Sequence, residues 1–290
     1  GSLFGPNPTG NTTLYSWTSI YSVIIDTPTG SNWTLIGSYT SGNPKGFIFR
    51  GSLSQLSVAP TAAAPPVPAG GNFYYPHINP LLDIVYLHSA QGDLVVGNGG
   101  SPASPAVAFL YKNGPTNMLQ IHFKEIIFPN APTTSVYGVW DNGGSIYTIV
   151  GGYGEGSVFT PITDIYNLNY GLPYPIGAGY IANYDKATDQ FLDWTTVPLP
   201  PGSNSNLLLH IQGISKVNNI YFLSAVVGNT TRTFVQGYLI TASKITGSFI
   251  FLDYVPIDSF DGSPSIVTSV ASNHVVGFPG PNNVYQAKIE

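Results

Sequence analysis

"SVYGVWDNGGSIYTIVGGY", residues 135–153, is the stretch that decides the expected fold of this chain. Two runs rich in Val, Ile and Tyr lie on either side of the turn-forming residues 141–144, and the second run leads to Gly151. Short β-branched and aromatic runs separated by an Asn-Gly turn predict a β-hairpin. Helical signals, such as apolar residues at i, i+3 and i+4 between caps, are nearly absent.

The second half of this hairpin, an apolar strand that ends at a small residue, recurs along the chain. The small residues that mark it are Gly37, Gly97, Gly151, Ser224 and Gly277. Another strand is expected before each mark and a third after it, and a fourth strand follows in the first four units. The expected strands are 19–23, 34–39, 46–49 and 53–58; 83–87, 94–98, 108–111 and 118–128; 135–139, 148–153, 179–182 and 191–197; 210–214, 221–226, 237–240 and 249–255; and 265–270, 274–278 and 284–287.

This repeat predicts an all-β protein, a five-bladed β-propeller of four-stranded antiparallel blades, with residues 1–290 as a single domain. One blade cannot bury both its faces, but blades packed around an axis cover each other. The last unit lacks a fourth strand, and residues 3–9 resemble residues 127–133. We therefore expect the N-terminal segment to pair beside 284–287 and close the last blade. A β-sandwich, or two of them, is the alternative.

Two stretches interrupt the repeat. The Pro-rich residues 59–69 are expected to form a stiff connector between the first two units, or an arm that contacts a partner. Residues 154–177, GEGSVFTPITDIYNLNYGLPYPIG, are an insertion in the third unit. Long loops on a rigid scaffold are often functional, and the alternative is an inert loop that covers a blade edge.

Aromatic and amide side chains make this insertion the expected ligand site. Tyr offers a flat apolar face and a hydroxyl, and Asn and Asp add donors and acceptors, which suits neutral carbohydrate or a protein surface. The candidate ligand-binding residues are Trp140, Tyr153, Glu155, Asp164, Tyr166, Asn169, Tyr170 and Tyr174. Trp140 lies beside the hairpin turn and is expected at the surface, whereas Trp194 is expected to pack within an outer strand.

The stretch at 135–153, together with GYIANYDKATDQFLDWTTVPLPPG at 179–202, resembles extracellular bacterial repeats of the HAF type. The aromatic strand of that repeat matches Ala108-Phe109-Leu110-Tyr111 and, more loosely, Gly46-Phe47-Ile48-Phe49. The plan of the whole chain is similar to five-bladed propeller lectins of the tachylectin type. The resemblance implies a propeller and export, but no reaction and no functional residue.

Composition excludes several classes of function. The chain has 9 basic and 14 acidic residues, a net charge of −5, and only 8% charged residues, so a nucleic-acid partner is not expected. It has no run of about 18 apolar residues that could span a membrane. It has no cysteine, which excludes disulfides and thiolate metal sites. Low charge with many Thr, Ser, Asn and Gly residues predicts an exported, extracellular protein, in which the sequons at Asn11, Asn32 and Asn229 matter only if the host glycosylates.

Catalytic motifs are largely missing, and no cofactor or metal is expected. There is no Gly-x-Ser-x-Gly, Walker or His-Glu-x-x-His motif. The glycine runs at 97–100 and 151–156 are interpreted as hairpin turns. Of the five histidines, none pairs with another at metal-ligand spacing, and we expect His210 and His274 to pack between blades.

Three carboxylates keep an enzymatic alternative open. Asp26, Asp83 and Asp141 lie at or near expected innermost strands of different units, where a glycoside hydrolase or lyase would need two carboxyl groups about 5–10 Å apart. Asp26 and Asp141 are followed by turn-forming residues, which favours turn capping instead.

The hypothesis that the sequence favours is an exported, non-enzymatic propeller that binds carbohydrate or a protein surface through aromatic and amide loops on one face. Binding is expected to depend little on salt, because charges are few. A glycoside hydrolase or lyase is the first alternative. A structural coat, fibre or surface module is the second.

Overall fold

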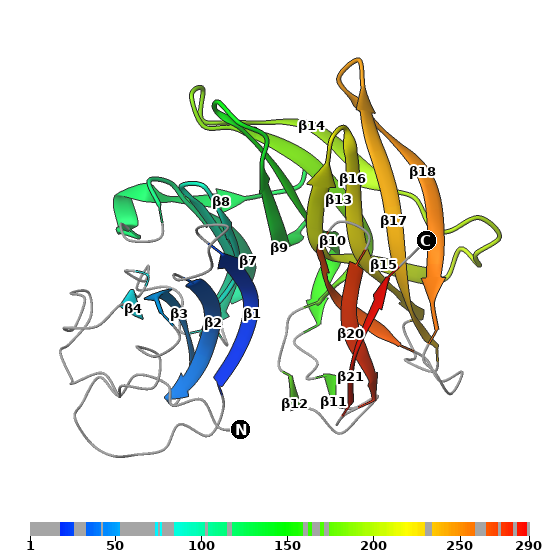
Figure 1. Ribbon diagram of the computed structural model, residues 1–290, viewed down its shortest axis with the longest axis horizontal. Helices are drawn as coiled ribbons and strands as arrows, with labels where there is room; N and C mark the ends of the chain where they lie inside the picture. The colour runs from blue at the N-terminus through cyan, green and yellow to red at the C-terminus, as the bar shows by residue number, and fades with distance from the viewer. Residues whose placement is uncertain are drawn as a thin grey trace. The chain divides into compact units, whose positions relative to one another are not determined.

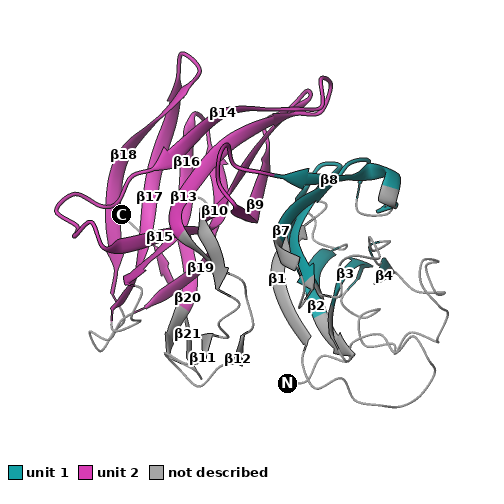
Figure 2. Cartoon of the chain, turned by 180° about the vertical axis from the view of Figure 1, so that it is seen from behind, with its two compact units in different colours: residues 1–126 teal, residues 127–290 magenta. Residues whose placement is uncertain are grey.

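The computed structural model divides the chain into two compact units, residues 1–126 (unit 1) and 127–290 (unit 2), which are coloured separately in Figure 2. Each unit is described by itself. The structure describes residues 18–25, 33–41, 43–52, 73–74, 76, 84–101, 104–114, 118–158, 162–163, 169–170, 174–229, 234–258, 265–271, 274–280 and 283–288.

Unit 1 contains two antiparallel four-stranded sheets, each with its strands side by side in chain order (Figure 1). The strands of the first sheet are β1 (Thr18–Ile25), β2 (Trp33–Ser41), β3 (Asn43–Gly51) and β4 (Phe73–Tyr74). The strands of the second sheet are β5 (Ile84–Gln91), β6 (Leu94–Ser101), β7 (Ser104–Tyr111) and β8 (Phe123–Ile126), and a short 3-10 turn, Gln120–His122, precedes β8.

Unit 2 repeats the same meander in three sheets (Figure 1). The third sheet of the chain contains β9 (Thr133–Asp141), β10 (Ile146–Val158), β13 (Tyr174–Asp185) and β14 (Gln190–Val197). The fourth contains β15 (Leu207–Val217), β16 (Ile220–Asn229), β17 (Val235–Ile245) and β18 (Ser248–Ile257). The fifth contains β19 (Ile266–Ala271), β20 (His274–Gly280) and β21 (Asn283–Lys288), and a small hairpin joins β11 (Ile162–Thr163) to β12 (Asn169–Tyr170).

The all-β expectation is confirmed, and the expected first, second and third strands of all five units match observed strands. The fourth strand expected at 53–58 lies outside the described residues, as does the Pro-rich connector at 59–69, and β4 pairs with β3 instead. The N-terminal segment that should close the last blade also lies outside them. The closed ring of five blades and the single domain therefore stay predictions.

Within each unit, successive sheets pack face to face as the blades of a propeller do. In unit 1, Ile36 and Ile48 from the first sheet pack with Leu87 and Phe109 from the second. In unit 2, one cluster joins the third and fourth sheets, and its members include Val150, Ile181, Ile211, Leu223 and Ile240. A smaller cluster joins the fourth and fifth sheets. Burial of these apolar faces is what holds neighbouring sheets together.

A β-bulge recurs at the same place in the first strand of each of the five larger sheets. The bulged residues, which have no single partner on the second strand, are Tyr21, His88, Tyr137, Gln212 and Thr268. A bulge adds one residue to a strand and increases its local twist. All five sheets therefore share this local geometry, including the three-stranded fifth sheet.

The small residues that mark the repeat lie opposite these bulges. A Cβ on Gly151 would collide with the carbonyl oxygen of Ser135, and a Cβ on Gly97 with that of Tyr86, so the first strand itself excludes a side chain there. The interpretation of the two glycine runs as turns is wrong, because both lie inside strands, β6 and β10.

The mark of the fourth unit shifts by one residue. Ala225 pairs with Ile211 just before the bulge, as the marking glycines of the other sheets do, whereas Ser224 pairs with Gly213 just after it. Only the register with β15 distinguishes Ser224 from the adjacent small residue Ala225. The sequence alone does not reveal this register, so it predicts the mark at the wrong one of the two residues.

Candidate functional site

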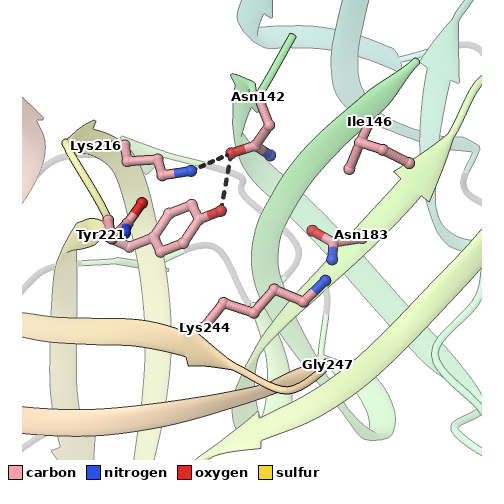
Figure 3. Close-up of a pocket in the computed structure, with 8 residues that line it drawn as sticks. Asn142, Ile146, Asn183, Lys216, Tyr221, Lys244 and Gly247 are labelled. Carbon is pink, nitrogen blue, oxygen red and sulfur yellow. Dashed lines mark hydrogen bonds between the residues drawn. The ribbon is translucent and has the colours of Figure 1, made fainter. Parts of the chain in front are cut away.

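An open pocket of about 380 Å³ lies in unit 2, where hairpin ends of the third and fourth sheets meet (Figure 3). Its lining comes from the β9–β10 turn, from β13, and from the β15–β16 and β17–β18 hairpins. The lining residues are Asn142, Ile146, Asn183, Lys216, Asn219, Tyr221, Lys244 and Gly247. Six of these eight side chains can form hydrogen bonds.

Asn142 organises one side of the pocket. Its Oδ1 accepts hydrogen bonds from Lys216 Nζ and from the Tyr221 hydroxyl, each at 2.8 Å, and Figure 3 shows both side chains pointing toward it. Its Nδ2 donates to Thr148 Oγ1 at 2.8 Å. The turn that carries Asn142 needs glycine, because Gly143 and Gly144 both have positive φ, 85° and 64°. These contacts hold the amide in one orientation.

Asn183 organises the other side. Thr148 Oγ1 donates to Asn183 Oδ1 at 2.9 Å, and Asn183 Nδ2 donates to Asp193 Oδ2 at 2.9 Å. Lys244 Nζ reaches the same Asp193 oxygen at 2.6 Å. One continuous polar network therefore runs from Lys216 to Lys244 and joins the two sheets beneath the pocket. A network whose members are all paired holds its groups in fixed positions.

Asp193 remains ionised within this network. Burial alone would raise the pKa of its carboxyl, but hydrogen bonds from Lys244 and Asn183 and the charge of Lys244 outweigh burial and lower the pKa below its ordinary value. Asp193 occupies a β-bulge of β14 with φ of 56°, a conformation that Asp tolerates better than most residues. The carboxylate is thus held beside Lys244 and balances its charge.

Lys216 and Asn219 both have capacity left for a ligand. Besides its bond to Asn142, the Lys216 ammonium lies 4.6 Å from the centre of the Tyr221 ring. An ammonium has three donors, and Asn142 takes one of them. Asn219 is exposed in the two-residue turn between β15 and β16.

Two of the predicted ligand residues, Tyr153 and Trp140, make contacts that belong to the packing of the sheets. The Tyr153 ring stacks on Phe128 with centroids 3.5 Å apart, and its hydroxyl bonds Thr196 Oγ1 at 2.6 Å, so one ring face is covered. Trp140 is partly buried and packs against the core between the third and fourth sheets rather than lying free at the surface. The expectation that Trp194 packs is confirmed, because its ring contacts Phe128, Tyr180 and Phe191.

The structure places the other predicted ligand residues only in part. Glu155 lies in β10 and Tyr174 in β13, where Tyr174 pairs with Val158. Asn169 and Tyr170 form β12, which pairs with β11 inside the insertion. Asp164 and Tyr166 lie outside the described residues. Of the predicted residues whose side chains the structure describes, Trp140 and Tyr153, neither lines the pocket of Figure 3, and a ligand site in the insertion stays a prediction.

Of the three carboxylates considered for an enzyme, the structure describes only Asp141. The Asp141 side chain accepts a hydrogen bond from the Gly143 backbone at 2.7 Å, which confirms the interpretation as a turn cap. Asp26 and Asp83 lie outside the described residues. Among the residues that the structure describes, no group of three or more His, Asp and Glu is arranged to hold a metal ion, and no helix is long and apolar enough to cross a membrane.

His210 packs between blades, as expected. It belongs to β15, is only 7% exposed and packs against β9, with its Nε2 2.8 Å from Ser135 Oγ and its Nδ1 3.0 Å from Gln212 Nε2. Because the Gln212 amide nitrogen can only donate, His210 Nδ1 accepts and Nε2 carries the proton toward Ser135. Burial lowers the pKa of His210 to about 3, which keeps the ring neutral. His274 is partly buried in β20.

Sequence reasoning missed the pocket, although a weak signal for it exists. Lysines stand next to several hairpin turns, as in YKNG at 111–114, SKVNN at 215–219 and SKITG at 243–247. These three lysines are a third of the nine basic residues in the chain. The pattern indicates where cations gather, but not which turns meet, because that depends on how the sheets pack.

No family model and no curated protein matches the chain. Among solved structures, the chain is similar to a GH43 β-xylosidase/α-arabinofuranosidase from a compost microbial metagenome, determined in complex with xylotriose in a calcium-free form. The similarity covers 93% of this chain and 98% of that one, with 11% sequence identity and a TM-score of 0.38.

Proposed function

We propose that the protein is an exported, non-catalytic propeller that binds carbohydrate, and that the ligand enters the pocket between the third and fourth sheets. The observation that carries this proposal is the lining: three asparagines, a tyrosine and two lysines from separate hairpins converge on one open space. Amides and ammonium groups on rigid hairpins can hydrogen-bond several hydroxyls of one sugar. A volume of about 380 Å³ suits one or two sugar units.

The part of the pocket lining that the structure describes lacks the carboxyl groups that hydrolysis requires. A glycoside hydrolase needs two carboxyl groups on either side of the scissile bond, one of them protonated to act as an acid. None of the eight described lining residues is a carboxylate. Asp193, which touches the lining, is bound by Lys244 and Asn183, and its lowered pKa is the opposite of what a general acid needs. This chemistry favours binding over catalysis.

The proposal is tested with a glycan array, followed by calorimetric titration of the strongest glycan against two variants. Asn219→Ala removes an exposed amide from the pocket and should weaken affinity about two- to tenfold, the usual effect of one hydrogen bond. Asn206→Ala removes an equally exposed amide just before β15, at the opposite end of that strand, and should leave affinity unchanged. Binding that neither variant alters, or that Tyr170→Ala alone abolishes, would move the site away from the pocket.

A further inference from the structure

The two lysines of the pocket differ in how their charges are balanced. The Lys244 ammonium lies 2.6 Å from the Asp193 carboxylate, which neutralises it locally. The Lys216 ammonium bonds a neutral amide oxygen and faces the Tyr221 ring, and no carboxylate pairs with it in the part of the chain that the structure describes. The pocket therefore carries one uncompensated positive charge, although the chain as a whole has a net charge of −5.

The Lys216 ammonium is also held in place before any ligand arrives. Asn142 Oδ1 fixes it from one direction and the Tyr221 ring from another, and Tyr221 is itself fixed by its own hydrogen bond to Asn142. Ordering a lysine side chain on binding ordinarily costs affinity, and contacts already made in the free protein reduce this cost. Two of its three donors remain available for an anionic group.

From this charge and this geometry we infer that the pocket selects acidic saccharides, with the carboxylate or sulfate of the sugar on Lys216. The inference rests on the proposed carbohydrate binding and specifies its ligand class. Bonds between an ammonium and a carboxylate or sulfate are stronger than neutral ones, so the charged group dominates selectivity. Affinity should then fall as salt rises, contrary to the weak salt dependence that the low overall charge predicts.

The test is a glycan array made of matched pairs: galacturonans with free and methyl-esterified carboxylates, glycans with and without sialic acid, and glycans with and without sulfate. Wild-type protein should bind the acidic member of at least one pair about tenfold more tightly than its neutral partner. Lys216→Gln keeps a donor for Asn142 but removes the charge, and should abolish the difference in affinity between acidic and neutral partners. Lys216→Arg should restore it.

Lys186→Gln is the matched control. Lys186 lies in the β13–β14 turn of the neighbouring sheet, does not line the pocket, and its loss changes the net charge by the same amount. This variant should keep the acidic preference. Equal losses from Lys186→Gln and Lys216→Gln, or equal wild-type binding of acidic and neutral partners, would overturn the inference while carbohydrate binding stands. The absence of any glycan binding would overturn both.

Discussion

Two polar clusters join the same two sheets of unit 2 and are built in opposite ways. At one, Ser135 and Tyr137 of β9 meet His210 of β15, deep in the sheet packing. At the other, Asn142 just after β9 meets Lys216 near the end of β15, at an open pocket. The first cluster is buried, neutral and closed. The second is charged and accessible.

The difference follows from the cost of burying a charge, and the proposed ligand site rests on it. Burial makes a charge costly, so the pKa of His210 falls. Both of its ring nitrogens are hydrogen-bonded, one to Ser135 and the other to Gln212. At the hairpin ends, solvent reduces this cost, and Lys216 and Lys244 retain donors that Asn142 and Asp193 do not use. We therefore expect the buried cluster to contribute to stability, and the open cluster is the proposed binding site.

The largest effect on stability is expected where β9 and β10 approach each other closely, at Gly151 beside the buried cluster. In Gly151→Ala, the new methyl group would collide with the Ser135 carbonyl, so we expect a loss of about 3 kcal/mol or more in the free energy of unfolding. Gly247→Ala, at a turn with φ of 89° and open space around it, should cost only about 1 kcal/mol. Urea unfolding measures both, and equal losses would show that the strands can separate at the bulge.

The next effect is the pH dependence that His210 contributes. Its pKa is about 3 in the folded protein and near its ordinary 6.5 when unfolded, so the unfolded state binds the extra proton between these values. Stability is therefore full above pH 6.5 and falls as pH drops toward 3, by up to about 1.4 kcal/mol per pH unit. The lowered pKa of the Asp193 carboxyl also makes stability fall as the pH drops. The contribution of His210 must therefore be measured separately.

His210→Gln serves as that comparison, measured by urea unfolding at pH 7, 5 and 4. The variant loses the titrating ring but keeps a donor for Ser135, so its stability should depend less steeply on pH than that of the wild type. Parallel curves for the two proteins would mean that the buried cluster admits a charge, and the contrast with the open pocket would fail.

The smallest expected effect lies at the open cluster. Asp193→Asn removes the carboxylate from Lys244 at a bulge whose positive φ Asn also tolerates, so we expect a loss of less than about 1 kcal/mol in stability, because the pair is 30% exposed on both sides. The same change frees the charge of Lys244 and should raise affinity for an acidic saccharide severalfold. Calorimetric titration measures the affinity, and an unchanged or lower value would mean that Asp193 helps to hold the ligand.

The sequence predicted what is local and missed what depends on packing. The hairpin at 135–153, the cap by Asp141 and the packing of Trp194 follow from nearby residues. The shift of the mark from Ser224 to Ala225 depends on the register with β15, which no single strand encodes. The pocket was missed because Asn142 and Lys216 are 74 residues apart and meet only when the third and fourth sheets pack.

The most direct test of the central claim is an NMR titration of the ¹⁵N-labelled protein with the acidic glycan that binds most tightly. We predict that the amide signals of Asn219, Gly247 and Gly143 shift as the glycan is added, while those of Gly151 and Gln212 beside the buried cluster stay in place. Shifts confined to Asn169 and Tyr170 in the insertion, with the hairpin-end signals unchanged, would contradict the account and place binding on the other candidate surface.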